Sequence, residues 1–169
     1  MKKNKIFWIE GLSGSGKTTL ANKIKANIEE LIGPTIVING DNIRSIFELK
    51  DYSINARKKI AKNYLKLAIF ISKQKINVIF TVVGLHGYLD KLIHSNPNII
   101  RVLIKSNVND IIKFGKKNTY KKNKKNIVGV DIKPIWPLKP NIIINNNFKK
   151  NTAKLAEILK KKIFKILKC

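Results

Sequence analysis

Short apolar runs alternate with amphipathic segments along almost the whole chain. The runs lie at residues 5–10, 35–39, 76–83, 98–105 and 141–145. Each is as short as a strand and mostly apolar, which is typical of strands whose two faces are both buried. Because such runs alternate with helical segments, the pattern predicts a parallel sheet with helices on both faces. The expected fold class is therefore a doubly wound, five-stranded α/β domain.

The segments between these runs have apolar residues spaced by three or four positions, as in amphipathic helices. The first predicted helix spans about residues 18–31 and is stopped by Gly33 and Pro34. Ser53 can cap a long helix, and the last helix begins near Thr152. Shorter helices are predicted at residues 42–48 and 108–114.

The length of 169 residues and the mass of 19.3 kDa fit one domain, which we place at residues 1–169. A Lys-rich polar stretch at about 115–127 is too short for a second domain and is predicted to form a lid. Cys169 is the only cysteine, so the chain has no intramolecular disulfide. It has no apolar run of membrane-spanning length and no secretion signal, so we expect a cytoplasmic protein without a membrane partner.

The formal net charge is +25, from 35 basic and 10 acidic residues. All the basic residues except Arg44, Arg57 and Arg101 are lysines. Lysine is enriched by AT-rich codons alone, whereas proteins that bind nucleic acid rely on arginine forks and aromatic platforms. We therefore expect no specific nucleic-acid partner. A basic, nucleotide-dependent binding protein is the alternative to an enzyme.

The segment GLSGSGKT at 11–18 matches the pattern G-x-x-x-x-G-K-[ST] in full. It follows a predicted strand and opens a predicted helix, so its glycines can turn backbone N–H groups toward a phosphate at the positive end of the helix. Lys17 can reach the β- and γ-phosphates of ATP, and the Thr18 hydroxyl can ligate Mg²⁺. ATP and Mg²⁺ are thus the predicted cofactors. The predicted ATP-binding residues are Gly11, Leu12, Ser13, Gly14, Ser15, Gly16, Lys17, Thr18 and Thr19.

Other motifs narrow the class of nucleotide-binding protein. The guanine-reading pattern N-K-x-D of GTPases is absent. The third predicted strand ends in IFTVVG and lacks the acid with which motor ATPases hold Mg²⁺. A small kinase is the class that fits best, because phosphoryl transfer needs little more than positioning and charge neutralisation.

A second signal, INGDNIR at 38–44, follows the second predicted strand at the edge where doubly wound sheets bind their ligands. Asp41 could orient or deprotonate the hydroxyl of an acceptor, or hold a water on Mg²⁺. Arg44, one helical turn later, could bind an anionic acceptor through its fork of N–H groups. The residues alone leave open whether Asp41 has this role or caps the short helix.

The chain resembles the adenylylsulfate kinase family from about residue 5 to 145. The resemblance rests on WIEGLSGSGKTTLA and NGDNIR, followed in order by DYS…R, TYKK and NIVGVD. That family phosphorylates the 3′-hydroxyl of adenosine 5′-phosphosulfate with Mg·ATP. The resemblance implies a P-loop nucleotide-kinase fold, a small nucleotide acceptor and a second copy of the chain as a candidate partner. Adenylylsulfate kinase is thus the first predicted activity.

The same resemblance assigns roles to individual residues. Asp41 and Lys17 would be catalytic, with Asp41 as the base or the positioner of the acceptor hydroxyl. Arg44 would hold the acceptor, Tyr52 would stack on its base, and Arg57 would meet its anionic part. The lid would add cations, and the loop that follows it would close the pocket. The remaining predicted acceptor-binding residues are Lys122 and Ile127.

The chain departs from the family pattern mostly on the acceptor side. Asn39 replaces the first carboxylate of the family's D-G-D-N, Lys62 and Asn63 replace paired arginines, and Ile127 replaces an aromatic residue. The ATP loop is unchanged. The alternative acceptor is another nucleotide-linked compound of surface-polysaccharide synthesis, such as cytidine diphosphoramidate. His86, just after the third strand, could touch the acceptor, but its loop position favours a solvated side chain.

Overall fold

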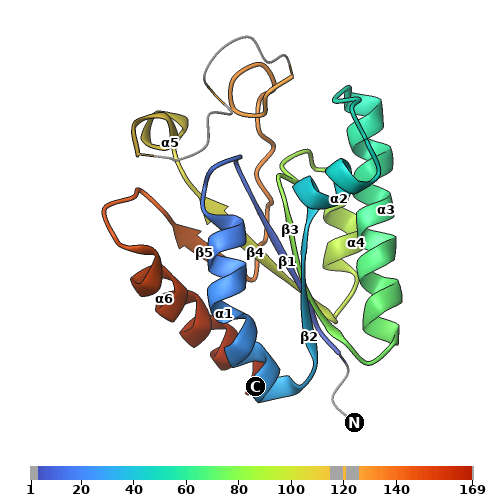
Figure 1. Ribbon diagram of the computed structural model, residues 1–169, viewed down its shortest axis with the longest axis vertical. Helices are drawn as coiled ribbons and strands as arrows, with labels where there is room; N and C mark the ends of the chain where they lie inside the picture. Colours follow the sequence, from blue (N-terminus) through green and yellow to red (C-terminus); the bar gives the residue numbers. More distant parts are fainter. Residues whose placement is uncertain (1–3, 115–119, 121–125, 169) are drawn as a thin grey trace.

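The strands in the described part of the chain form one parallel sheet in the order β2-β3-β1-β4-β5 (Figure 1). The computed structural model describes residues 4–114, 120 and 126–168. The strands are β1 (Ile6–Gly11), β2 (Thr35–Asn39), β3 (Asn77–Val82), β4 (Ile99–Lys105) and β5 (Ile142–Asn145). The helices are α1 (Lys17–Ile32), α2 (Gly40–Ile46), α3 (Ile54–Lys73), α4 (Asp90–His94), α5 (Val108–Phe114) and α6 (Thr152–Leu167).

The central strand β1 contributes to two apolar cores, one on each face of the sheet. Because successive side chains of a strand point to opposite faces, Phe7 and Ile9 pack with residues of α1 and α6. Ile6 and Trp8 pack with residues of α3 and α4. Figure 1 shows these helices in two layers on either side of the sheet. The arrangement confirms the predicted doubly wound α/β fold.

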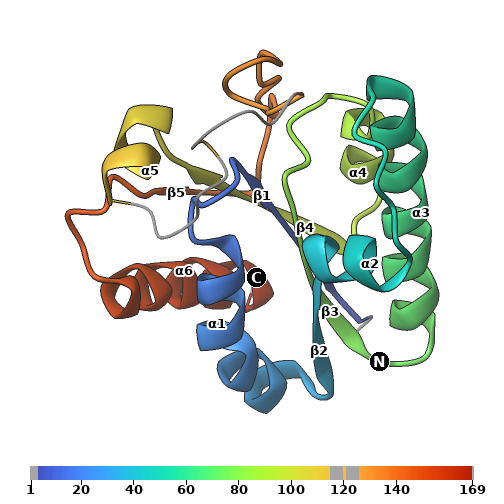
Figure 2. The ribbon, with the colours of Figure 1, turned by 45° about the horizontal axis from the view of Figure 1, so that its top comes forward.

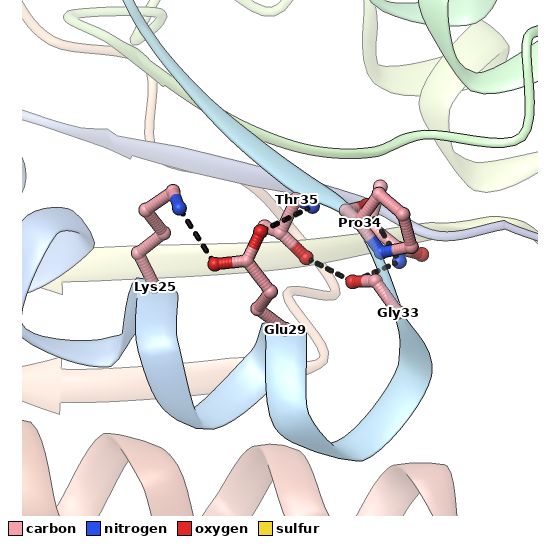
Figure 3. Close-up of polar contacts among 6 residues, drawn as sticks. Lys25, Glu29, Gly33, Pro34 and Thr35 are labelled. Atoms are coloured by element: carbon pink, nitrogen blue, oxygen red, sulfur yellow. Dashed lines mark hydrogen bonds and ion pairs between the residues drawn. The ribbon is translucent and has the colours of Figure 1, made fainter.

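The turn between α1 and β2 fixes the amino-terminal end of β2 (Figure 3). Gly33 has φ 96°, a left-handed value that favours glycine, and its N–H donates to the Glu29 carbonyl at 2.9 Å. The Glu29 carboxylate accepts from Lys25 Nζ at 2.7 Å and from the Thr35 N–H at 3.4 Å. The Lys25–Glu29 pair is exposed and its attraction is screened by solvent, so it adds little to stability. The turn therefore positions β2 more than it stabilises the fold.

The loops that carry the predicted site gather at the carboxyl ends of the strands (Figure 2). The loop after β1, helix α2 and the segment that follows residue 126 all lie around this edge. A third apolar cluster packs the loop after β1 against the segment that follows residue 126, whereas Ile43 of α2 packs against the cluster that includes α3 and α4. The third cluster is formed by Leu12, Leu85, Leu103, Ile111 and Val128. None of the helices in the described residues is long and apolar enough to cross a membrane.

Candidate active site

Glycines shape the loop between β1 and α1. Gly16 has φ 93° just before the first turn of α1, a backbone conformation that other residues rarely adopt. Gly11 lies so close to β4 that a Cβ atom would be 2.4 Å from the Ile104 carbonyl oxygen. A side chain at either position would displace the loop. In this shape the loop borders a cavity of about 590 Å³ at the positive, amino-terminal end of α1.

The loop side chains predicted to bind phosphate and Mg²⁺ lie together at this cavity. The Lys17 Nζ donates to the Leu12 carbonyl at 2.7 Å, which holds the lysine across the loop. The Thr18 hydroxyl accepts from the Asn39 Nδ2 at 3.1 Å. A threonine hydroxyl and the carboxylate of Asp41, which also borders the cavity, are hard oxygen ligands that suit Mg²⁺ alongside ATP phosphates. The predicted loop residues that line the cavity are Gly14, Gly16, Lys17, Thr18 and Thr19.

The other predicted loop residues support this cavity from behind. Leu12 belongs to the third apolar cluster, and Ser15 is fully buried. The Ser15 carbonyl accepts from Asn146 Nδ2 at 3.0 Å, and the Ser13 carbonyl accepts from the Tyr120 hydroxyl at 3.1 Å. Burial raises the pKa of Tyr120 to about 12, so the hydroxyl stays a neutral donor. Sequence reasoning missed Tyr120 and Asn146, although Asn146 follows directly after β5 at the ligand-binding edge.

Asp41 lies in the first turn of α2 and borders two cavities. One is the cavity of the ATP loop, and the other, of about 100 Å³, is lined by the predicted acceptor residues. Helix α2 begins at Gly40, earlier than predicted, because the Asn39 side chain caps it by accepting from the Asp41 N–H at 2.9 Å. The alternative that Asp41 is the cap is therefore wrong, and its carboxylate lies where the two cavities meet.

The smaller cavity brings together Asp41, Arg44, Tyr52 and Arg57, as predicted. The guanidinium carbons of Arg44 and Arg57 lie 4.1 Å and 5.4 Å from the centre of the Tyr52 ring. Arg57 Nε donates to the Tyr52 carbonyl at 2.9 Å, and its Nη2 donates to the Asn126 carbonyl at 2.7 Å. Arg57 thus ties helix α3 to the end of the predicted lid.

The prediction of a solvated His86 is wrong. The side chain is only 8% exposed, lines the acceptor cavity and stacks on Tyr88 with the ring centres 5.5 Å apart. Burial and the nearby Arg57 charge lower the pKa of His86 to about 4. Glu10, at the end of β1, also lines this cavity and was not predicted to be functional. The sequence did contain a signal for Glu10, because an acid is rare at the end of a buried strand and this one lies directly before the ATP loop.

Two predicted acceptor residues cannot be placed in the cavity. Lys122, with most of the predicted lid at 115–127, lies outside the described residues. Ile127 is half-buried and its N–H donates to the Asp131 carboxylate at 2.9 Å, in a turn that follows Asn126. Ile127 is not among the residues that border the cavity, so its contact with an acceptor stays a prediction.

Comparison with known proteins decides the family. Residues 3–145 match the sequence model of the family described as adenylylsulphate kinase. The chain belongs to the adenylylsulfate kinase family. Relatives of this family include the cytidine diphosphoramidate kinase of Campylobacter jejuni, which is 30% identical over 96% of this chain and 99% of that protein. The adenylyl-sulfate kinase of Buchnera aphidicola is 26% identical over 93% of this chain and 79% of that protein.

A solved structure of an adenylylsulfate kinase has the same fold. The Mycobacterium tuberculosis APS kinase CysC, in complex with AMPPNP and APS, superposes with a TM-score of 0.83 at 18% identity, over 96% of this chain and 99% of that chain. This chain has Asn39 where the family pattern has a carboxylate, and the structure shows what the asparagine contacts. Here the Asn39 amide bridges Thr18 and the Asp41 N–H, so it orders both groups without adding a second negative charge.

Proposed function

We propose that this protein transfers the γ-phosphoryl group of ATP to a hydroxyl group of a small nucleotide-linked acceptor. The position of Asp41 on the wall shared by the two cavities is the observation that carries this proposal. A carboxylate at that point can orient the acceptor hydroxyl toward the γ-phosphate and remove its proton. Membership of the adenylylsulfate kinase family supports the same reaction.

Each half of the site has a distinct task in this reaction. The loop backbone and Lys17 would hold the ATP phosphates, and Thr18 would hold Mg²⁺, which supplies charge neutralisation when bound. Arg44 and Arg57 would bind the anionic part of the acceptor. The Tyr52 ring, which is 48% exposed, offers a face on which the acceptor base can stack.

Cytidine diphosphoramidate is the acceptor that we favour. The relative that carries this name aligns with nearly the full length of both chains, and a cavity of about 100 Å³ suits the smaller, pyrimidine base. Adenylyl sulfate is the second candidate, because the family model and the Buchnera relative carry its name. Both compounds are nucleoside 5′-phosphates with a second tetrahedral anionic group, so one pair of arginines could serve either.

The test is phosphoryl transfer by the purified protein. The protein is incubated with Mg·ATP and each acceptor in turn, and transfer of a labelled γ-phosphoryl group is measured. We expect transfer to at least one acceptor, and phosphorus NMR of the product should show a phosphate monoester on a ribose hydroxyl. ATP hydrolysis without a phosphorylated acceptor would contradict the proposal.

A further inference from the structure

Glu10 is a buried carboxylate that the proposed phosphoryl transfer leaves unused. It is fully buried at the end of β1, directly before the ATP loop. Its Oε1 accepts from Arg101 Nε at 2.6 Å, and its Oε2 accepts from Arg101 Nη2 at 3.3 Å. Arg101 Nη2 also pairs with Asp90 Oδ1 at 2.5 Å. One guanidinium thus faces two carboxylates, so the cluster holds more hydrogen-bond acceptors than Arg101 alone can satisfy.

The surroundings of Glu10 link this cluster to the acceptor cavity. Glu10 and Trp8 both border that cavity, whereas Asp90 and Arg101 border a different one. Across the cavity wall, Gly84 has φ 62°, and a Cβ atom there would be 2.9 Å from Glu10 Oε2. The Trp8 Nε1 lies beside the Glu10 carboxylate and lowers its pKa, but it makes no hydrogen bond of good geometry in the described residues. This wall therefore presents the Glu10 carboxylate, with one indole N–H beside it, to whatever fills the cavity.

We propose that Glu10 selects the terminal group of the acceptor by accepting a hydrogen bond from an N–H group, so that a phosphoramidate end is preferred to a sulfate or phosphate end. The inference rests on the proposed function and names the substrate class of the same site. Glu10 is a specificity residue in this scheme, because it touches the acceptor but not the transferred phosphoryl group.

Hydrogen bonding, rather than charge, separates the two natural end groups. A phosphoramidate and a sulfate are both tetrahedral and each carries one negative charge in these compounds. The phosphoramidate, however, offers an NH₂ donor where the sulfate has only acceptor oxygens. An ionised carboxylate can only accept, and Arg101 occupies about half of the lone pairs of Glu10. A sulfate oxygen against Glu10 would leave two acceptors facing each other in a buried site, whereas Trp8 Nε1 could donate to an oxygen of either group.

The experiment compares matched acceptors that differ at one end. On cytidine, cytidine diphosphoramidate is compared with cytidylyl sulfate, and on adenosine, adenosine diphosphoramidate is compared with adenylyl sulfate, so that the two ends of each pair carry the same charge. Transfer of labelled phosphoryl from ATP gives kcat/KM for each at pH 8, because burial raises the pKa of Glu10 to about 7. The parent protein should prefer the amidate end by roughly 10-fold or more on both nucleosides, the value of one hydrogen bond to a charged group.

Two isosteric variants separate recognition from general effects on the cluster. Glu10→Gln supplies both a donor and an acceptor, so the amidate preference should fall roughly 10-fold. Asp90→Asn removes the same charge from the same arginine but lies outside the acceptor cavity, and it should keep the preference. An unchanged preference in Glu10→Gln, or an equal loss in both variants, overturns the inference.

The outcomes also distinguish this inference from the proposed function. Transfer by the parent protein without any end-group preference overturns the role of Glu10 and leaves the kinase activity standing. A preference that follows the base rather than the end group overturns it as well. Should Glu10→Gln fail to give a cooperative thermal transition, the parent comparison alone decides. No transfer to any of the four acceptors overturns both proposals.

Discussion

The donor and acceptor halves of this site are built in different ways. The predicted phosphate-binding groups of the donor half come from one continuous segment, Gly11 to Thr19, between a fully buried strand and a buried helix face, and residues of β3 and of the segment between β5 and α6 complete the cavity around them. The acceptor half is assembled from separate segments, represented by Glu10, Arg44, Arg57 and His86. Backbone N–H groups and glycine conformations dominate the first half, whereas side chains dominate the second.

This difference explains which half can vary among members of the family. Backbone groups that bind phosphate tolerate few residue types, because Gly11 and Gly16 are restricted by sterics and by φ. Side chains that bind an acceptor can change one at a time while the fold is kept. We therefore expect the donor half to be the more constant part of the site and the acceptor half to decide which molecule is phosphorylated.

Loss of the lysine in the donor loop should have the largest effect. Replacing Lys17 with Ala should reduce kcat by roughly 10³–10⁵-fold, the range for a cation that neutralises charge on the transferred phosphoryl group. The loss should be the same with either acceptor, because Lys17 belongs to the donor half. Labelled phosphoryl transfer measures it.

The matched control is Lys25→Ala on the same helix. Lys25 pairs with Glu29 on an exposed surface far along α1 from the ATP loop. This variant should keep the parent rate and nearly the parent thermal stability. Parent-like turnover in Lys17→Ala would contradict the assignment of the donor half.

Asp41 tests the boundary between the halves. Asp41→Asn should reduce kcat by roughly 10²–10⁴-fold, the usual contribution of a general base. ATP affinity, measured by calorimetry with a non-hydrolysable analogue, should change much less. Glu157→Gln, on the exposed side of α6, is the control and should leave both unchanged. Equal losses in ATP affinity and kcat would show that Asp41 serves Mg²⁺ rather than the acceptor.

The donor half was predictable because its signals are local. The glycines of GLSGSGKT indicate the shape of this loop, and the apolar runs indicate the strands of the sheet. Both the fold and the position of the ATP loop could therefore be predicted from the sequence. Arg44, Tyr52 and Arg57 were placed in the acceptor cavity by resemblance to the family, and the structure brings them together there.

The deep wall of the acceptor cavity was not predictable in the same way. Glu10 gains its environment from Arg101, 91 residues away in sequence, and from the close approach of Gly84. His86 follows a strand like any loop residue, but in the fold its backbone pairs with the distant Ile135 and its side chain is buried. No local pattern encodes contacts between such distant segments.

Ile127 probes how much the acceptor half depends on a second aromatic wall. Ile127→Phe would restore the aromatic residue that the family pattern has at this position. Because stacking contributes roughly 1–3 kcal/mol per base, KM for adenylyl sulfate should fall by about 5- to 150-fold. KM for cytidine diphosphoramidate should change less. No change for either acceptor would show that Ile127 does not reach the bound base.

The smallest effect concerns the response of the acceptor half to pH. The pKa of His86 is about 4 in the folded protein and near 6.5 in the unfolded chain. Between these two pH values the unfolded chain binds the proton and the folded protein does not, so the free energy of unfolding rises with pH. The pKa of Glu10 is raised from 4.5 to about 7, so the folded state binds the proton first, and stability falls as pH increases over that range. Each contribution is of order 2–3 kcal/mol, and they have opposite sign.

We therefore expect the free energy of unfolding of the parent protein, measured with urea, to change little between pH 4.5 and 6.5. Glu10→Gln removes one contribution, so its stability should rise with pH across this window, and His86→Asn should show the reverse slope. NMR of the imidazole protons should place the His86 midpoint near 4. Both buried groups border the acceptor cavity, and neither borders the donor cavity. If the free energy of unfolding changed with pH in the same direction in both variants, the acceptor half would not be the pH-sensitive part of the molecule.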